Sequence, residues 1–386
     1  MILTTKEIQK KYNYTLKDLM LHYAAVSGEI PNKLIDELGI TQYNKNYITR
    51  KSNFTDFFVY RKGGGLNGYQ LQNKGINYLL KANSDYTLFT TMNFGNRKPT
   101  ADIFKRKRYQ RKAWLYHYFD ELDVNYFHSQ TNSTNFFYCS ENIKKLYTKF
   151  SNINIENIEE YEIKGSRIYG TLRLNKDLYN VYVFDDSFDT LYTGIEYRAN
   201  TLIADVFNKE NIETIIFTRG IEEQNRVLGE ILNAMTSMKN KYNQKQYSFF
   251  RYSQQLGLSD IHILSFDEIG KRQLELMKNK SKADEAIRRI ITNNYSLLAS
   301  ASDYELYKRD GIDCDARILD QPCFFIYSLD IYKIKQAYDI LTSEDGVFFY
   351  FVCFEKHIPV IQKLFSDINI DAYILCIPIE VLDVDI

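Results

Sequence analysis

In the first 83 residues, the spacing of apolar residues changes from that of a helix to that of a β-strand. This change constrains the fold more than any other feature of the sequence. Apolar residues recur at helical spacing over residues 16–26, and Gly28 ends that helix. A second, shorter helix is predicted over residues 31–39, and Thr41 is a suitable N-cap for a third over residues 42–51. The chain therefore begins with short helices that form one small domain.

An extended segment follows the third helix. Residues 57–61 have the aromatic and β-branched content of a strand, GGGLNG at 63–68 supplies turn residues, and residues 69–71 form the returning strand. A further helix carries Ile76, Leu79 and Leu80. Three helices followed by a glycine-tipped hairpin is the order of a winged helix, a helix-turn-helix fold. We therefore expect an α+β winged-helix domain over residues 1–83.

In a winged helix the third helix enters the major groove of DNA, and the hairpin lies against the adjacent backbone or minor groove. We expect Tyr47 and Ile48 to face inward and the polar side chains of this helix to reach base edges or phosphates. The candidate DNA-binding residues are Gln42, Asn44, Lys45, Asn46, Thr49 and Arg50 on the helix, with Arg61 and Lys62 beside the glycine tip. The alternatives are a solubilising polar face and a contact with another protein.

The charge of the chain is distributed unevenly, although its net value is zero. Residues 1–113 hold 20 Lys and Arg against 8 Asp and Glu, a net charge of +12, and residues 114–386 carry the opposite net charge of −12. This asymmetry favours a polyanion as the partner of the N-terminal part, although two domains that dock on each other would give the same pattern.

A basic run, KRKRYQRK at 105–112, opens a helix predicted over residues 101–127, and its first half is charged all round. Binding of such a basic segment to a DNA duplex is favoured, because it releases counterions condensed on the phosphates. Lys105, Arg106, Lys107 and Arg108 are therefore added to the candidate DNA-binding residues, and a solvated linker helix is the alternative. The polar segment SQTNSTN at 129–135 is a candidate linker.

Beyond residue 135, predicted strands alternate with helices, a pattern typical of α/β domains with a mixed, partly parallel sheet. The clearest helix carries Val227, Leu228, Ile231, Leu232, Met235 and Met238. The candidate strands are 166–173, 179–184, 193–196, 213–218, 261–266, 323–327, 347–354 and 372–377. We divide the chain into a winged helix (1–83), a basic helix and linker (84–135), a nuclease-like α/β domain (136–240) and a C-terminal α/β region (241–386).

The order of elements in the third of these segments matches the restriction-endonuclease-like core of PD-(D/E)xK nucleases. In that core an Asp and a Glu on neighbouring strands hold Mg²⁺, and a Lys two residues after the Glu orients the attacking water. The candidates here are Asp185 or Asp186, Glu196, and Arg198 in place of Lys. Arg stays protonated and is a poorer partner for water activation, so activity is uncertain and Mg²⁺ is expected only if this alternative holds. Glu162 to Lys164 is a competing match without a convincing acidic residue on a preceding strand.

Other chemistry has less support in the sequence. The five histidines are dispersed, and no P-loop or GxSxG motif occurs. Cys353 and His357 are interpreted as a core cysteine and a surface histidine rather than a catalytic pair. The five cysteines form no CxxC pair, so no metal, disulfide framework or cofactor is expected. The start of the sequence lacks the pattern of a signal peptide, and no apolar run approaches the ~18 residues of a membrane span, which predicts a cytoplasmic protein without a membrane partner.

The organisation of residues 15–220 resembles the replication-relaxation family of plasmids and integrative elements in Gram-positive bacteria. The matching segments are GYQLQNKGINYLL at 68–80, RYQRKAW at 108–114, SRIYGTLRL at 166–174, VYVFDD at 181–186 and TGIEYRAN at 193–200. The resemblance implies a DNA-binding accessory protein for replication or DNA relaxation of a mobile element. We therefore expect a sequence-selective protein that binds double-stranded DNA. A Mg²⁺-dependent nuclease and a protein-interaction scaffold are the alternatives, and a homodimer is left open.

Overall fold

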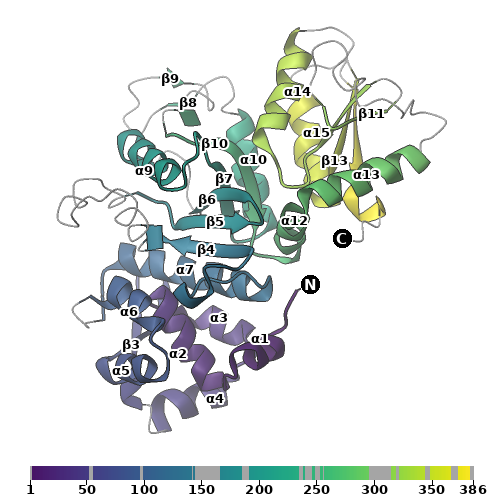
Figure 1. Cartoon of the computed structure of the whole chain (residues 1–386). Coiled ribbons are helices and arrows are strands. Elements are labelled where there is room, and N and C mark those ends of the chain that lie inside the picture. The colour runs from purple at the N-terminus through teal and green to yellow at the C-terminus, as the bar shows by residue number, and fades with distance from the viewer. Residues whose placement is uncertain are drawn as a thin grey trace. The chain divides into compact units, whose positions relative to one another are not determined.

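The computed structural model describes residues 2–51, 55–95, 99–140, 142–143, 166–184, 191–233, 238–239, 246–247, 253–254, 256–294, 314–318, 321–343, 348–366 and 373–382. The chain divides into two compact units, Met1–Leu146 and Tyr147–Ile386. Figure 1 shows helices and a hairpin in the first unit; among the described residues the second unit holds two larger sheets and one two-stranded sheet. The prediction of a mixed α and β protein with mixed sheets is confirmed.

The first unit is built around α2 (Leu16–Ser27), which is buried from Leu19 to its end. Thr15 and Asp18 form a capping box at its start, and Gly28 ends it at a left-handed φ of 98°, as the sequence predicts. The other described elements of this unit are α1 (Thr5–Tyr12), β1 (Ile30–Pro31), α3 (Asn32–Glu37), α4 (Gln42–Asn46), the π-helical turn η1 (Tyr47–Lys51), η2 (Thr55–Phe57), β2 (Phe58–Gly63), β3 (Leu66–Leu71), α5 (Asn73–Ala82), α6 (Tyr86–Phe94), α7 (Ile103–Glu121), η3 (His128–Gln130) and β4 (Asn135–Cys139).

The hairpin and β1 form a small antiparallel sheet in the order β1-β3-β2. Tyr69 of β3 pairs with Ile30 on one side and with Tyr60 of β2 on the other. Gly64 and Gly65 form the two-residue tip, with φ values of 56° and 75° that glycine adopts without a steric cost. The hairpin therefore lies where the sequence predicts it, but its turn of two residues is shorter than the predicted turn over residues 63–68.

A polar network fills the centre of the first unit. Asp120 of α7 is fully buried and accepts hydrogen bonds from the hydroxyls of Tyr12 (2.7 Å), Tyr23 (2.9 Å) and Tyr126 (2.8 Å). Burial alone would raise the pKa of Asp120, but hydrogen bonding to His22 and Tyr12 holds that pKa below its usual value. The carboxylate therefore stays ionised in the core and ties α1, α2 and α7 together.

In the first sheet of the second unit, the strands of this unit are in the order β10-β7-β6-β5. Here β5 (Gly170–Leu174) and β6 (Asp177–Val183) form an antiparallel hairpin, whereas β7 (Glu213–Thr218) is parallel to both β6 and β10 (Ser259–Ser265). The described helices that follow these strands are α9 (Thr193–Val206), α10 (Ile221–Asn233), α12 (Glu268–Lys278) and α13 (Lys280–Asn294), and β8 (Met238–Lys239) pairs with β9 (Gln246–Tyr247).

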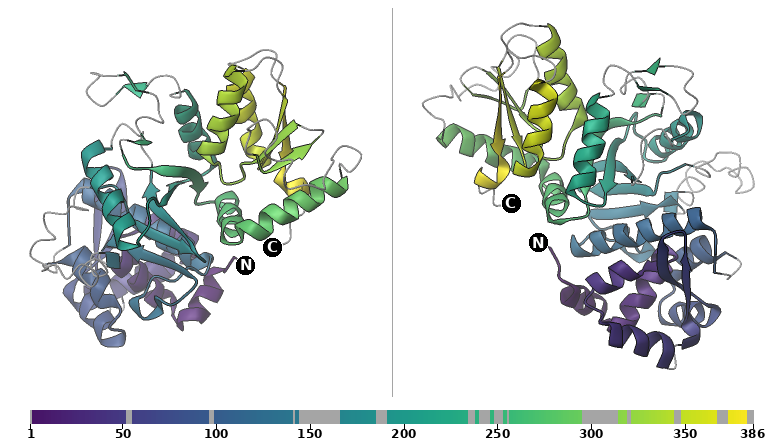
Figure 2. Two further views of the ribbon diagram at one scale, coloured as in Figure 1. Left: turned by 45° about the horizontal axis from the view of Figure 1, so that its top comes forward. Right: turned by 180° about the vertical axis from the view of Figure 1, so that it is seen from behind.

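The second sheet has the order β11-β12-β13-β14 and is seen from two further sides in Figure 2. Its strands are β11 (Ala316–Ile318), β12 (Gln321–Phe325), β13 (Phe348–Cys353) and β14 (Tyr373–Pro378), of which the last three are parallel. The elements that accompany it are α14 (Ile331–Ser343), η7 (Glu355–His357), α15 (Ile358–Ser366) and η8 (Ile379–Leu382). The prediction of buried, partly parallel strands is confirmed here.

Three local predictions are wrong. Residues 193–196 are the start of α9 rather than a strand, because Glu196, Ala199, Asn200 and Ile203 are buried at helical spacing. Two of these buried residues are polar, so a search for apolar periodicity does not find the helix. Met238 lies in β8, beyond the end of α10. The segment at 129–135 is not a linker but a turn within the first unit, where Asn125 donates a hydrogen bond to Ser133 before β4 begins.

Candidate functional site

The outward face of α4 and η1 is more aromatic than the sequence predicts. Gln42, Tyr43, Tyr47 and Arg50 are exposed, and Tyr43 and Tyr47 are 75% and 53% exposed. These residues lie at i, i+1, i+5 and i+8, which is one side of a helix, and Ile48 lies on the opposite, buried side. The prediction that Tyr47 faces inward is wrong, whereas the prediction for Ile48 is confirmed.

Lys45 lies on the inner side of this helix and not on its outer face. Its side chain is buried, and Nζ is 3.5 Å from Oδ1 of Asp36. The expectation that Lys45 is exposed is therefore wrong, because position 45 shares the buried side with Ile48. Asn44 and Thr49 are half-buried, and the side chains of Gln42 and Asn46 hydrogen-bond to each other at 3.0 Å.

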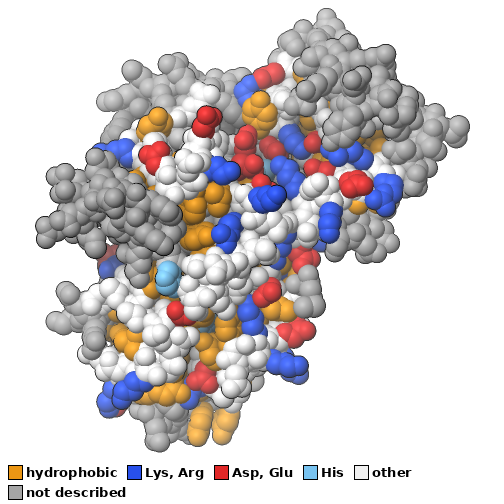
Figure 3. All heavy atoms as spheres, viewed as in Figure 1, with side chains coloured by type: hydrophobic (Ala, Val, Ile, Leu, Met, Phe, Trp, Pro, Cys, Tyr) orange, Lys and Arg blue, Asp and Glu red, His pale blue; other side chains and the backbone are white. Residues whose placement is uncertain are grey.

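The hairpin lies beside this helix. Burial raises the pKa of Tyr69 on β3, and that shift is partly offset by a hydrogen bond with Thr49 and by the charge of Arg50, so the end of η1 lies close to β3. Tyr60 is 46% exposed, and its ring centroid is 5.1 Å from that of Tyr69. Lys62 is exposed near the tip. In Figure 3, hydrophobic side chains and both basic and acidic side chains are exposed on this unit.

A buried ion pair between Glu29 and Arg106 contacts the backbone of the hairpin. Nε and Nη2 of Arg106 on α7 each donate a 2.8 Å hydrogen bond to the carboxylate of Glu29. Nη2 also donates to the carbonyl oxygens of Arg61 (2.9 Å) and Leu66 (3.2 Å), one on each strand of the hairpin. Gln70 completes the arrangement with a 2.6 Å hydrogen bond to Glu29. Arg106 therefore holds the hairpin in place.

The prediction that Arg106 contacts a phosphate is contradicted by this burial, because its side chain is only 2% exposed. Lys112 is also buried and donates to Asn93, so the basic residues in the first half of α7 do not all face solvent. The helix packs against α2, and in its first half Arg106 and Lys112 are buried beside Tyr109. Of the remaining basic residues Lys105 is exposed, whereas Lys107 and Arg108 are half-buried.

Glu196, the candidate nuclease residue, performs a structural task. Its side chain is fully buried and accepts hydrogen bonds from the Ser166 hydroxyl (2.6 Å), the Arg167 backbone N–H (2.8 Å) and the Tyr182 hydroxyl (3.1 Å). Arg198 is exposed, and its Nε donates to the carbonyl oxygen of Gly194. Residues 185–186 and 162–164 lie outside the described part of the chain. Of the predicted triad, the structure therefore describes Glu196, whose carboxylate accepts structural hydrogen bonds, and Arg198, which is exposed.

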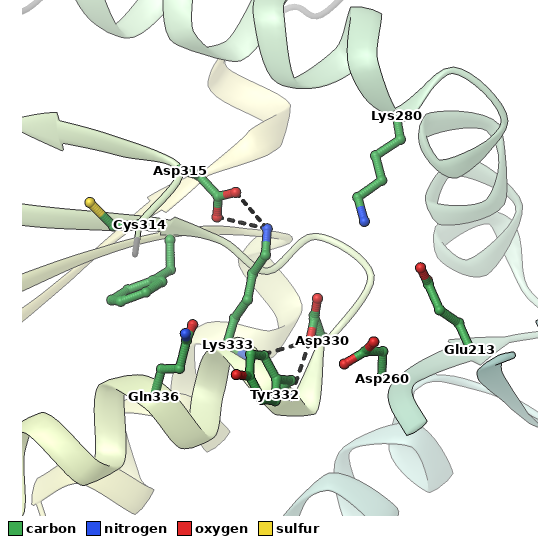
Figure 4. A pocket seen from close by; sticks show the side chains of 10 residues that line it. Glu213, Asp260, Lys280, Cys314, Asp315, Asp330, Tyr332, Lys333 and Gln336 are labelled. Carbon is green, nitrogen blue, oxygen red and sulfur yellow. Dashed lines mark hydrogen bonds and ion pairs between the residues drawn. The ribbon is translucent and has the colours of Figure 1, made fainter. Parts of the chain in front are cut away.

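A polar cleft of about 240 Å³ lies in the second unit (Figure 4). Most of its charged groups already have partners: both oxygens of Asp315 lie 2.7 Å from Nζ of Lys333, and Asp330 accepts from the first backbone N–H groups of α14. The lining residues are Glu213, Asp260, Lys280, Cys314, Asp315, Phe324, Asp330, Tyr332, Lys333 and Gln336.

Carboxylates outnumber ammonium groups in this cleft, four to two among the lining residues. Burial raises the pKa of Asp260, and the neighbouring charges of Asp330 and Glu213 raise it further. Burial alone would lower the pKa of Lys280, but the charge of Glu213 and other carboxylates raises it. The excess of carboxylates means that the cleft favours binding of a cationic group over binding of an anion. Among the described residues no three His, Cys, Asp or Glu side chains are grouped so that they could hold a metal ion.

His357 is buried, so its interpretation as a surface histidine is wrong, whereas Cys353 is buried as expected. Nδ1 of His357 lies 3.0 Å from Oδ1 of Asn225 on α10, and Nε2 has no hydrogen-bond partner among the residues that the structure describes. Burial lowers the pKa of His357 to about 4. The imidazole is therefore neutral near pH 7 and serves as a packing group between α10 and η7.

No helix in the described part of the chain is long and apolar enough to cross a membrane. No protein-family model, curated protein or solved structure matches this chain.

Proposed function

We propose that the first unit is a winged-helix domain that binds double-stranded DNA through α4, η1 and the β2–β3 hairpin. The observation that carries this proposal is the element order α2, β1, α3, α4, β2, β3, with β1 added to the hairpin beside β3. That arrangement presents one short helix and one glycine-tipped hairpin side by side, the two elements that a winged helix places in adjacent grooves.

The exposed side chains of these two elements suit a duplex. Arg50, Lys62 and Lys105 are exposed cations, and Gln42 carries an amide that can pair with a base edge. The net charge of +12 in residues 1–113 adds long-range attraction to a polyanion. Although Lys45, Arg106 and Lys112 are buried, enough basic residues remain to neutralise several phosphates, so we propose a sequence-selective DNA-binding accessory or regulatory protein.

The two alternatives have weaker support. A PD-(D/E)xK nuclease needs Glu196 on a strand with its carboxylate available, whereas that carboxylate lies on a helix and accepts three hydrogen bonds. A protein-interaction scaffold accounts for the exposed tyrosines, but it accounts for the basic charge only if its partner is acidic. Replication or DNA relaxation of a mobile element is the biological setting that we propose for the DNA-binding activity.

Binding of the full chain to a labelled duplex at several salt concentrations tests the proposal. The logarithm of the association constant should fall linearly with the logarithm of salt concentration, with a slope of about −0.9 per neutralised phosphate. A double charge reversal at Arg50→Glu and Lys62→Glu should weaken binding at least about tenfold. The matched control reverses two exposed cations of α13, Lys282→Glu and Arg289→Glu, and should have little effect.

Two results would contradict this proposal. One is the absence of salt-dependent binding to any duplex, which would favour the scaffold. The other is an equal loss of affinity in the two charge-reversed proteins, which would show that total charge rather than the face of α4 and the hairpin controls binding.

A further inference from the structure

Phe104 is the most exposed of the large hydrophobic side chains that the structure describes, at 81%. It lies in the first turn of α7, next to Ile103, which is itself 47% exposed. A phenylalanine in such a position loses the free energy of burial that the same residue gains in a core, and it adds nothing to the packing of α7. Together, these two adjacent exposed side chains form a small apolar patch, and a contiguous patch can mark a contact with another molecule.

The first turn of α7 is fixed to the tip of the hairpin. A Cβ added to Gly64 would lie 2.9 Å from two carbon atoms of Ile103, so this side chain rests directly on the tip. Arg106 donates to the carbonyl groups of both hairpin strands from the same turn. Asp102 caps the helix by accepting from the backbone N–H of Lys105 at 2.8 Å. Phe104 therefore projects from a rigid support beside the proposed wing.

Two exposed cations lie on the same support as this apolar group. Lys105 follows it directly in the sequence and is exposed, and Lys62 is exposed on the hairpin to which the turn is attached. An apolar side chain that shares a support with exposed lysines is complementary to the minor groove of DNA, where phosphates line both edges and the base-pair stack forms the floor. A contact with another protein would not in itself require these lysines.

We propose that Phe104 is an apolar wedge that enters the minor groove beside the hairpin, partly separates two stacked base pairs and bends the duplex. The inference rests on the proposed DNA binding of the first unit and adds an activity to it, the deformation of the bound DNA. Wedges of this kind kink a duplex by about 20–90° towards the major groove. Because pyrimidine–purine steps unstack most easily, the wedge also adds a preference for such a step beside the site read by α4.

Energy transfer between dyes at the two ends of a duplex of about 30 base pairs tests the wedge with the full chain. Wild-type protein should bring the ends closer. Phe104→Ala should abolish that change and weaken binding by about five- to fiftyfold, the effect of losing a wedge contact while the phosphate contacts remain. Phe104→Leu should still bend the duplex, because leucine also acts as a wedge. Tyr78→Ala, at an exposed aromatic residue on α5, is the control and should bend DNA like wild type.

The outcomes separate this inference from the function on which it rests. Salt-dependent duplex binding without bending, or equal bending by wild type and Phe104→Ala, would overturn the wedge and leave the DNA-binding domain standing. A failure of wild type to bind any duplex would overturn both. Self-association in sedimentation experiments that Phe104→Ala removes, together with unbent DNA, would instead assign Phe104 to a protein contact.

Discussion

At the scale of single residues, the structure separates basic side chains that face solvent from those that hold the fold. Lys45 and Arg106 belong to the second group, although the sequence alone placed them with Arg50 and Lys105. The sequence alone does not distinguish an exposed basic residue from one in a buried ion pair. Only the position of the acidic partner in the fold distinguishes the two roles. Glu29, the partner of Arg106, lies 77 residues away in the sequence, so no local pattern reveals the pair.

The Glu29–Arg106 pair predicts a large effect on the stability of the first unit. Arg106→Met leaves a buried carboxylate without its cation and should cost about 3–5 kcal/mol of unfolding free energy. A second substitution, Glu29→Leu, removes that carboxylate, so the double variant should be less destabilised than the sum of the two single variants. The fluorescence of Trp114, the only tryptophan of the chain and part of α7, reports the urea unfolding of this unit. Additive losses would show that the two groups do not depend on each other.

His357 predicts a pH dependence of the second unit. Its pKa of about 4 in the folded chain lies below the ordinary value of 6.5, so the unfolded chain takes up the proton first as pH falls. The stability that His357 contributes is thus fully present above about pH 6.5 and is lost progressively towards pH 4, by roughly 3 kcal/mol in total.

Urea unfolding near pH 7 and near pH 5, followed by circular dichroism, checks this dependence. His357→Gln has no group to protonate, so it should lose less stability than wild type between the two pH values. Asp260 and Asp284 have raised pKa values and act in the opposite direction, but they are present in both proteins and cancel in the comparison. Identical pH profiles for the two proteins would show that His357 does not titrate as proposed.

At the scale of elements, the hairpin tip provides a matched pair of glycines. Gly64 and Gly65 both have left-handed φ values, but only Gly64 has a neighbour, Ile103, where a Cβ would lie. Alanine at either position should cost about 1 kcal/mol through backbone strain, and Gly64→Ala should cost more because it also displaces the first turn of α7. If that turn supports the DNA-binding face, Gly64→Ala should weaken duplex binding more than Gly65→Ala. Equal effects on unfolding and on binding would show that the contact with Ile103 is unimportant.

Most strands and the early helices could be predicted from the sequence, because their apolar residues follow the period of the element and glycine or threonine marks its ends. The helix α9 could not, since Glu196 and Asn200 occupy two of its buried positions and hydrogen-bond there to other side chains. The candidate DNA-binding face was found in outline from its charge and glycine content. The exposure of Tyr43 and Tyr47 on this face, and of Phe104 on α7, could not be predicted, because a sequence does not show that an aromatic residue is exposed.

At the scale of the whole molecule, the buried carboxylate of Glu196 predicts that the protein does not cut DNA through a PD-(D/E)xK site built on this residue. Incubation of supercoiled plasmid with the purified full chain and Mg²⁺ should leave the plasmid supercoiled, whereas a nuclease would convert it to nicked or linear forms. Mn²⁺ should give the same result. Cleavage that disappears in Glu196→Gln, with folding confirmed by circular dichroism, would restore the nuclease alternative.

The central claim is that α4, η1 and the hairpin of the first unit form the surface that meets DNA, and hydrogen exchange tests it most directly. Backbone exchange of the full chain is measured by mass spectrometry with and without a saturating duplex. We predict slower exchange in peptides that cover residues 42–51 and 58–71 and in the first turn of α7, with little change in the second unit. Protection confined to the second unit, or no protection anywhere under saturating conditions, would contradict the account.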